Sequence, residues 1–470
     1  MVEFNYKKND VVNIKIIDID EKGQGIGKVE GFTLFVKDTV IGDVAEVKVM
    51  KTKKTYGFAK LMKIITPSAD RIEPACPHAR ACGGCQLQEM SYDAELRFKE
   101  NKVKNNLIRL GGFPEEFIES IKEPIVGMNP CFRYRNKAQY PVGTDKEGNP
   151  IVGFYAGHTH DIIANTDCLL GRGVNQKILR IILDFLKKEK IKSYNETTNV
   201  GLFRHVLIRE GFKSGEIMVC FVVNGKSFPK EKELCEKLVS EVPEIASICL
   251  NVNEEKTNVI MGNPTRVLWG KETISDSLGE VKFNISARSF YQVNPVQAEK
   301  LYSKALEYAD LSGKESVWDL YCGIGTISLF LARNAGKVYG VEVIPEAIED
   351  AKENAFANGI TNAEFFVGKA EEVLPEFYSE KNDSDMLHPD VIVVDPPRKG
   401  CDEKCLETML LMEPDRIVYV SCDSATLARD LKILCAEKYE LKAWQVYDQF
   451  CKTVHCETVV LMVRNTDKKD

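Results

Sequence analysis

The sequence lacks the features that mark membrane proteins, exported proteins and proteins that coat nucleic acid. Its longest purely apolar runs, such as Ile217–Val223, fall far short of the about 20 residues that a membrane-spanning helix needs. The N-terminal residues MVEFNYKKND contain no apolar stretch of the kind found in signal peptides. The net charge of −7 argues against nonspecific coating of nucleic acid. We therefore expect a cytoplasmic protein that does not enter a membrane.

The composition is that of a folded protein with several domains. The 470 residues are 44% hydrophobic and 28% charged, enough to build large cores, and the chain length predicts about three domains. Charge is unevenly distributed, because residues 1–65 contain 12 lysines against nine acidic residues. No internal repeat is visible in the sequence. The N-terminal region therefore differs in charge from the rest of an acidic chain.

This N-terminal region is predicted to form a small β-barrel. From Val11 to Ile65, short alternations of apolar and polar residues are separated by glycines, a pattern typical of short strands and tight turns. The segment GQGIG is similar to a phosphate-binding loop, but a strand-like segment follows it instead of the helix that such a loop needs. We interpret these glycines as a hairpin turn.

The rest of the chain divides at about Ser275. Residues 66–275 combine strand patterns such as GEIMVCFVV with helical patterns, and NVNEEKTNVI is predicted to form a hairpin. After Ser275, strands alternate with helices, which predicts a doubly wound, mostly parallel sheet with ligands at the carboxyl ends of its strands. The predicted strands are VWDLYC, KVYGVEV, AEFFVGK, VIVVDPP and RIVYVSC, and the helices include TISLFLARNA, PEAIEDAKENAFANG and SATLARDLKILCAE.

A nucleoside site is predicted at that edge of the sheet. Gly323 and Gly325 follow the strand DLYC and precede a helix, so the backbone there can approach a ligand closely. Glu342, at the end of the next strand, can accept both hydroxyls of a ribose. Ser328 stands where a dinucleotide site requires a third glycine, which weakens the case for a pyrophosphate. Asp395 ends a further strand before two stiff prolines and suits the rim of a substrate pocket.

A nucleophile and a base are predicted near the C-terminus. Cys422 lies at the end of a strand and ahead of a helix, where the helix dipole favours a thiolate. An isolated cysteine is more often a small core residue, so its partners decide the interpretation. His455 and Glu457 alternate with apolar residues at the start of the last predicted strand and can point to one face. Glu457 can then serve as a general base.

Three cysteines form a candidate metal site. Cys76, Cys82 and Cys85 are spaced C-x5-C-x2-C around two glycines, a strong metal signal in a reducing compartment. The fourth ligand must come from elsewhere in the chain. Four thiolates suit an iron–sulfur cluster, and zinc is the alternative, with His78 as a competing ligand.

Two basic segments are candidates for RNA contact. CFRYRNKAQYPV combines cations that neutralise phosphates with tyrosines that stack on unpaired bases, and a solvated strand face is an equally good interpretation. GLFRHVLIREG has the same character. Two histidines, His158 and His160, are interpreted as exposed polar residues. The residues of the two basic segments are Arg133, Tyr134, Arg135, Lys137 and Tyr140, and Arg204, His205 and Arg209.

Taken together and in order, the C-terminal motifs closely resemble those of the RNA uracil-C5-methyltransferases. They are SFYQVN, DLYCGIGTIS, DPPRKG, YVSC with a following TLARD, and TVHCETVVLM. The N-terminal GQGIGKVEGFTLFV and GDVAEVKV resemble a TRAM domain, an RNA-binding barrel. The resemblance implies an α/β protein with an OB-like TRAM barrel at 1–66, a mixed α+β central domain with iron–sulfur cysteines at 67–275, and a Rossmann-like class I methyltransferase domain at 276–470.

The resemblance also implies roles for individual residues. S-adenosyl-L-methionine is the expected cofactor, Cys422 the nucleophile and Glu457 the base. Cys168 is the expected fourth ligand of a 4Fe–4S cluster. The expected partner is 23S ribosomal RNA, bound by a monomer, and the alternatives are a tRNA uridine methyltransferase and a non-catalytic RNA-binding iron–sulfur protein. The resemblance assigns cofactor contact to Gln292, Tyr321, Glu342 and Asp395, and the cluster to Cys76, Cys82, Cys85 and Cys168.

Two positions depart from the family pattern. The family usually has Asn-Pro or Asp-Pro after the nucleophile, where this chain has Asp423 and Ser424. It usually has proline four positions before His455, where this chain has Cys451. The first change concerns the turn beside the thiolate, and the second adds a thiol near the base. Neither removes a group that the mechanism requires.

Overall fold

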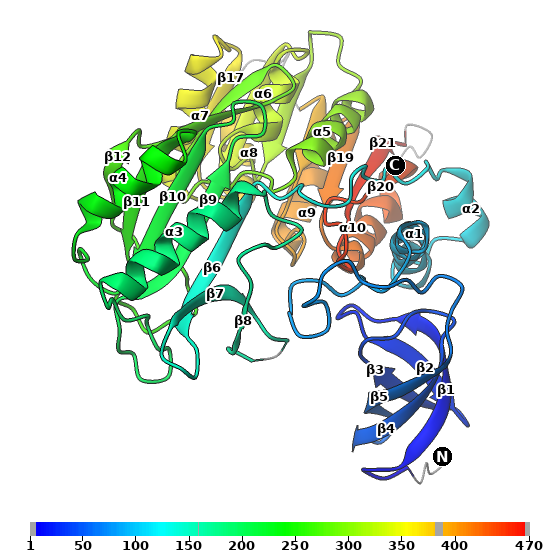
Figure 1. The fold of residues 1–470 in the computed structure, drawn as a ribbon. Helices are drawn as coiled ribbons and strands as arrows, with labels where there is room; N and C mark the ends of the chain where they lie inside the picture. Colours follow the sequence, from blue (N-terminus) through cyan, green and yellow to red (C-terminus); the bar gives the residue numbers. More distant parts are fainter. Residues whose placement is uncertain (1–5, 158, 381–388, 466–470) are drawn as a thin grey trace.

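The computed structural model describes residues 6–157, 159–380 and 389–465, and Figure 1 shows their arrangement. The N-terminal barrel forms a lobe of its own, and two seven-stranded sheets with their covering helices form the larger part of the molecule. The predicted α/β class is therefore confirmed.

The first five strands close into the predicted barrel. They hydrogen-bond in the order β1-β2-β3-β5-β4, and alternate residues such as Ile14 and Ile16 point into a common core. Gly23 has a φ of 79° in the turn that joins β1 to β2, so the glycine-rich segment is a hairpin turn as predicted. The strands are β1 (Val11–Ile19), β2 (Gly25–Val29), β3 (Phe32–Val36), β4 (Val44–Thr52) and β5 (Tyr56–Thr66).

The segment after the barrel carries three cysteines and leads into helices α1 (Tyr92–Arg109) and α2 (Glu115–Ser120). These helices precede the central sheet in sequence, yet α1 packs against α10 (Ser424–Glu437) and β20 (Tyr439–Tyr447), as Figure 1 shows. Leu107 is fully buried in the core that they share. Helix α1 therefore supports the C-terminal sheet.

The central sheet has the strand order β12-β11-β10-β9-β6-β7-β8. Every residue of β10 is buried, because Phe221 and its alternate neighbours pack under α3 and α4, whereas Cys220 faces the C-terminal core. The elements are β6 (Lys137–Thr144), β7 (Pro150–Tyr155), β8 (Ile162–Ala164), α3 (Val174–Lys188), β9 (Phe203–Glu210), β10 (Ile217–Val223), α4 (Glu231–Glu241), β11 (Ile245–Val252) and β12 (Thr265–Gly270).

The predicted hairpin NVNEEKTNVI is wrong. β11 ends at Val252, and its antiparallel partner β12 begins only at Thr265. The intervening loop is held by the amide of Asn253, which donates hydrogen bonds to the carbonyls of Val259 and Ile260 at 2.7 and 2.9 Å. A side chain thus satisfies backbone groups that the prediction assigned to a strand ladder.

The C-terminal sheet has the order β17-β16-β15-β18-β19-β21-β20. Its first five strands are parallel, as the alternation predicted, and β20 and β21 form an antiparallel hairpin at one edge. A separate hairpin, β13 (Ile274–Leu278) and β14 (Val281–Ile285), precedes the sheet. The strands are β15 (Ser316–Leu320), β16 (Lys337–Glu342), β17 (Ala363–Val367), β18 (Val391–Val394), β19 (Arg416–Ser421) and β21 (Glu457–Arg464).

Helices cover both faces of this sheet. Helices α5, α6 and α7 pack on one face, and α8, α9 and α10 pack on the other together with α1. Their termini follow the expected chemistry: α7 starts on Pro345, and the chain leaves it through Gly359, whose φ is 65°. Among the described residues, no helix combines the length and the apolar character needed to cross a bilayer. The remaining bounds are α5 (Pro295–Ala309), α6 (Thr326–Ala332), α7 (Pro345–Ala357), α8 (Ala370–Glu380) and α9 (Glu403–Met412).

Candidate active site

The loop between β15 and α6 is shaped for close approach of a ligand. Tyr321, Gly323 and Gly325 have φ angles of 71°, 55° and 82°, all in the left-handed region. A side chain added at Gly323 would meet no atom within 4 Å, so this glycine faces open space. For Tyr321 the same conformation carries strain of about 1–3 kcal/mol, and strain of this kind concentrates at functional sites.

Glu342 ends β16 beside this loop. One carboxylate oxygen accepts a hydrogen bond from the amide of Gly323 at 3.3 Å, and the other accepts from the amides of Val343 and Ile344 at 2.8 and 3.1 Å. The carboxylate is therefore fixed against the loop by three backbone groups. Its place at the end of the strand next to β15 fits the acceptance of ribose hydroxyls.

Asp319 lies beneath the same loop and carried no signal in the sequence beyond its place in an apolar strand. Its side chain is fully buried and accepts a hydrogen bond from the hydroxyl of Ser328 at 2.5 Å. Burial raises the pKa of Asp319 to about 7, and the nearby charge of Asp395 acts in the same direction. Ser328, which replaces the third glycine of a dinucleotide motif, thus binds a buried carboxyl group.

Three residues predicted to share the site come from three adjacent strand ends. Asp395 follows β18, Cys422 follows β19, and Glu457 begins β21. The charges of Glu457 and Asp395 raise the pKa of Cys422, and the charge of Asp395 raises the pKa of Glu457. The fold therefore brings the predicted nucleophile and base within electrostatic reach of each other and of Asp395.

The pKa of the Cys422 thiol is raised. Burial, together with the charges of Glu457 and Asp395, raises it to about 12, while Arg398 acts in the opposite direction. The expectation that the helix dipole favours a thiolate stays a prediction. The side chain of Asp423 caps α10, accepting hydrogen bonds from two of its first amides, and its charge also raises the pKa of Cys422.

The carboxyl groups of the site are also biased toward their neutral forms. Burial and the charge of Asp395 raise the pKa of Glu457 well above its usual value, and burial raises the pKa of Asp395 to about 7. Burial and the charge of Arg398 lower the pKa of His455 to about 4. Arg398 favours the ionised forms of both Cys422 and Glu457, a role that its place in DPPRKG did not reveal.

Gln292 belongs to a buried network with Gln449, in the loop that precedes β21. Its side-chain oxygen accepts a hydrogen bond from the amide of Gln449 at 3.1 Å, and Asn294 donates to the carbonyl of Gln449 at 2.9 Å. Tyr302 of α5 faces the same place: burial and the charges of Asp395 and Glu457 raise its pKa, and a hydrogen bond with Gln292 lowers it. Tyr302 was missed by sequence reasoning because it lies on an ordinary amphipathic helix.

The two departures from the family pattern have structural partners. Ser424 accepts a hydrogen bond from the side chain of Asn106 on α1 at 2.8 Å. Cys451 is buried beside Met128 and Tyr134, and it interacts through its thiol with Cys131. Both positions therefore contact residues that precede the C-terminal sheet in sequence.

The structure brings the four predicted metal-binding cysteines into one neighbourhood. Burial and the charge of Cys168 raise the pKa of Cys76, Cys82 and Cys85, that of Cys85 to about 12. The segment is fixed to the hairpin β7–β8, because the amide of Gly83 donates to the carbonyl of Tyr155 at 2.9 Å. The amide of Gly84 donates to the sulfur of Cys82 at 3.4 Å. An all-thiol donor set of this kind fits an iron–sulfur cluster.

A different group has the most compact arrangement of metal-ligating atoms. In the described chain, Glu95, Asp448 and Cys451 place one ligand atom each within 4.8 Å of one another. The ammonium group of Lys99 already contacts both carboxylates, at 2.8 Å from Glu95 and 2.6 Å from Asp448. A positive charge is therefore present at this place without a metal.

The two basic segments are buried in part, whereas the half-buried side chains of Arg133, Arg135 and Lys137 stay candidates for RNA contact. Tyr134 and Tyr140 are almost fully buried, so neither ring can stack on a base. Arg204 and Arg209 are buried too, and both guanidinium groups donate to backbone carbonyls. Arg133 forms an ion pair with a carboxylate at 2.7 Å. These side chains hold the central sheet in place, and the interpretation as a solvated face is equally wrong for the buried ones.

A cavity of about 300 Å³ lies between the barrel and the cysteine segment. Lys22 and Lys37 line it from the barrel, Arg80 lines it from the cysteine segment, and His455 lines it from the C-terminal hairpin. Of the two histidines interpreted as exposed, His160 is exposed and contacts Glu196, and His158 lies outside the described residues.

Comparison with known proteins gives matches over the whole chain. The family described as tRNA (Uracil-5-)-methyltransferase matches residues 248–465, and the TRAM domain matches residues 7–62. Proteins named as uncharacterized RNA methyltransferases are 49% identical in Halalkalibacterium halodurans and 47% identical in Clostridium tetani, over 97% and 98% of both chains. The crystal structure of Pyrococcus abyssi tRNA (uracil-54, C5)-methyltransferase in complex with S-adenosyl-L-homocysteine is 27% identical, with a TM-score of 0.74, and the match covers 96% of this chain and 100% of that one.

Proposed function

This chain belongs to the RNA (uracil-5-)-methyltransferases that use S-adenosyl-L-methionine, and from that premise we propose that it methylates carbon 5 of a uridine in 23S ribosomal RNA through a covalent bond between Cys422 and carbon 6 of the uracil. The membership confirms the resemblance inferred from the motifs and the prediction of an enzyme. The ribosomal substrate, the covalent step and the residue roles are our proposal.

The chemistry of uracil requires a nucleophile and a base. Carbon 5 is a poor nucleophile until a thiolate adds to carbon 6 and creates an enolate. Carbon 5 then attacks the methyl group of the sulfonium donor. The proton left on carbon 5 passes to the Glu457 carboxylate, the carbon–hydrogen electron pair restores the ring double bond, and the Cys422 thiolate leaves. Each group thus acts once and is regenerated.

The observation that carries this proposal is the convergence of Cys422, Glu457 and Asp395 at adjacent strand ends. Negative charges here compete, because burial and the charges of Glu457 and Asp395 raise the pKa of Cys422, and burial and the charge of Asp395 raise the pKa of Glu457. A buried carboxyl group with a raised pKa suits a residue that must accept a proton near neutral pH. The positive charge of Arg398 favours the thiolate, and a bound sulfonium would act in the same direction.

The residues that would hold the methyl donor fit it. Gly323 offers an open backbone approach, Glu342 offers a fixed carboxylate for the ribose, and Gln292 and Asp395 lie toward the reacting groups. Tyr321 is strained at the same loop. We propose that these four residues, Gln292, Tyr321, Glu342 and Asp395, form the donor site.

We further propose that Cys76, Cys82, Cys85 and Cys168 hold a 4Fe–4S cluster. Four thiol groups suit the iron atoms of such a cluster, and zinc is the alternative occupant of an all-thiol site. The iron and sulfur content of purified protein tests this directly, and a stoichiometric zinc content would contradict it.

The substrate class rests on the domain combination. A barrel and a four-cysteine segment beside the catalytic part resemble the ribosomal RNA enzymes, and the cavity lined by Lys22, Lys37 and His455 offers a path for RNA toward the site. The match to the archaeal tRNA enzyme covers 96% of this chain, barrel included, and therefore favours tRNA as the second candidate. We propose that the protein acts on ribosomal RNA as a cytoplasmic monomer.

Transfer of labelled methyl groups to 23S ribosomal RNA fragments and to tRNA transcripts separates the two candidates. Methylation of ribosomal RNA with none of tRNA is expected, and the reverse would replace the substrate in this proposal. RNA that contains 5-fluorouracil should trap a covalent protein–RNA adduct, since fluorine cannot leave as a proton does. Cys422→Ala should abolish both the adduct and turnover. Unchanged methyl transfer by Cys422→Ala would disprove the covalent mechanism. It would not distinguish ribosomal RNA from tRNA as the substrate.

A further inference from the structure

The hairpin loop between β20 and β21 controls the position of Glu457. Tyr447, the last residue of β20, pairs directly with Glu457, the first residue of β21, so residues 448–456 close on the proposed base. The loop thus leads directly into the residue proposed as the base.

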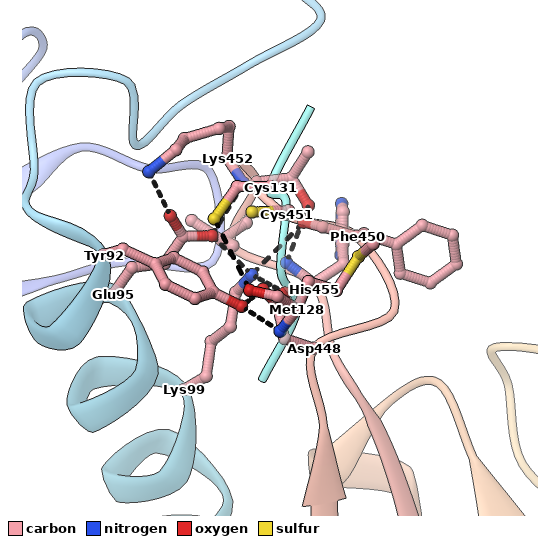
Figure 2. Close-up of polar contacts among 12 residues, drawn as sticks. Tyr92, Glu95, Lys99, Met128, Cys131, Asp448, Phe450, Cys451, Lys452 and His455 are labelled. Carbon is pink, nitrogen blue, oxygen red and sulfur yellow. Dashed lines mark hydrogen bonds and ion pairs between the residues drawn. The ribbon is translucent and has the colours of Figure 1, made fainter. Parts of the chain in front are cut away.

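One side of the loop is anchored by an ionic cluster on helix α1, drawn in Figure 2. The ammonium group of Lys99 contacts Glu95 at 2.8 Å and Asp448 at 2.6 Å, and it donates to the carbonyl of Phe450 at 3.2 Å. Glu95 also accepts from the side chain and the amide of Lys452, at 3.0 and 2.6 Å. The side chains of Lys99, Glu95 and Asp448 are 0% exposed. The loop is thus held at three of its residues by one buried cluster.

The cluster is balanced in charge and specific in direction. Two ammonium groups face two carboxylates, and Tyr92 donates a further hydrogen bond to Asp448 at 2.7 Å. Burial by itself lowers the pKa of Lys99, but the charges of Glu95 and Asp448 outweigh burial and raise it. Well-packed apolar side chains often stabilise a protein as well as a buried ion pair does, so stability alone does not explain such a cluster. The cluster is explained by its hydrogen bonds to Asp448, Phe450 and Lys452, which fix the position of the loop.

The other side of the loop contacts the segments proposed to bind the methyl donor and the cluster. Gln449 donates to the side chain of Gln292, and the carbonyl of Lys452 accepts from the amides of Gln86 and Leu87, at 3.0 and 3.1 Å. Cys422 lies at the end of β19 and before the cap of α10, and it takes no part in these loop contacts. The nucleophile and the base share the ladder in which Ser421 of β19 pairs with Thr458 of β21, whereas the loop contacts act on the side of the base.

Resting on the proposed function, we propose that Lys99 is a positioning residue for proton removal from carbon 5. Its ammonium group fixes Asp448 and Phe450, and through them the start of β21, so that the Glu457 carboxylate meets the methylated ring. Lys99 contacts neither substrate nor donor, and addition of Cys422 to carbon 6 does not depend on it.

Lys99→Met separates the two steps. With uridine RNA, turnover should fall by about 10- to 100-fold, the range expected for a misplaced catalytic group. With 5-fluorouracil RNA, the rate of adduct formation should stay within about twofold of wild type, because this trap does not use the base. The methylated adduct should also accumulate on uridine RNA, as it does for a blocked proton-removal step. Lys104→Met is the matched control, since Lys104 lies on the same helix and pairs with Glu119 away from the loop.

Equal loss of turnover and of adduct formation, or no loss of turnover, would overturn the inference. Absence of an adduct with wild-type protein would instead disprove the proposed function. Asp448→Asn covers the case in which Lys99→Met does not fold, because it keeps the size of the side chain and the pair between Lys99 and Glu95. It should show the same selective loss of turnover at about tenfold, and a proportional loss in both assays would again overturn the inference.

Discussion

Buried ionisable side chains gather in two places beside β21, and the two differ in whether each charge has a partner. Around Lys99, each carboxylate contacts an ammonium group within 3.0 Å. Around Glu457, no ion pair is formed by Asp319, Asp395 or Glu457 within the described part of the chain. The paired group fixes a loop, whereas the unpaired carboxyl groups have raised pKa values, which is typical of catalytic sites.

The largest expected effect is the loss of turnover when Glu457, the proposed base, is neutralised. Glu457→Gln removes the proton acceptor, so turnover should fall by about 100- to 10,000-fold. Trapping by 5-fluorouracil RNA should persist, and the free energy of unfolding at pH 7 should not decrease, because no paired charge is lost. Glu440→Gln, at an exposed position of β20 paired with Lys442, is the control. Steady-state kinetics, adduct gels and urea unfolding measure the three quantities, and a loss of stability would contradict the comparison.

Removing the charge of Lys99 from its ion pairs with Glu95 and Asp448 should lower the free energy of unfolding. Lys99→Met leaves two buried carboxylates with one ammonium group, so the free energy of unfolding should fall by about 3–5 kcal/mol. Lys104→Met breaks a more exposed pair and should cost less than about 1 kcal/mol. Urea unfolding monitored by circular dichroism compares the two. Equal costs would show that burial and pairing do not distinguish these lysines.

The unpaired carboxyl groups should also make stability depend on pH. The pKa of Asp319 in the folded protein, about 7, lies above its usual value of 3.8. This group therefore contributes stability that is fully present below pH 3.8 and is lost as the pH rises through 7. Between pH 5 and pH 8, wild type should lose about 1–3 kcal/mol more than Asp319→Asn does. Parallel losses in urea unfolding would mean that Asp319 is already ionised at pH 5.

The smallest expected effect concerns Arg398, whose positive charge acts on Cys422 and Glu457. Arg398 lowers the pKa of Cys422, so Arg398→Gln should slow adduct formation at pH 7 by about three- to tenfold. Because the pKa of the thiol lies near 12, the variant has fewer ionised thiols by the same factor at every pH between 7 and 9, so the deficit should stay constant over that range. Lys399→Gln, the exposed neighbour, should have little effect. A deficit that disappears at saturating RNA would indicate that Arg398 acts on RNA binding and not on the thiol.

Much of the C-terminal fold could be predicted because its signals are local. β15 to β19 are short apolar runs, and α7 is bounded by Pro345 and Gly359, so periodicity and caps sufficed. The hairpin NVNEEKTNVI failed because the amide of Asn253 bonds to loop carbonyls. The exposure of Arg209 was predicted wrongly, because charge in the sequence does not reveal burial. Its guanidinium group is buried and donates hydrogen bonds to two backbone carbonyls.

The sequence by itself determined the order of strands and helices, the glycine loop at Gly323, and the identity of the groups proposed for catalysis, since each depends on neighbours along the chain. Only the tertiary structure decided that Lys99 meets Asp448 across 349 positions, that Tyr302 faces Gln292, and that the pKa of Cys422 is raised. Burial and long-range charge set these properties, and neither is encoded in any one segment.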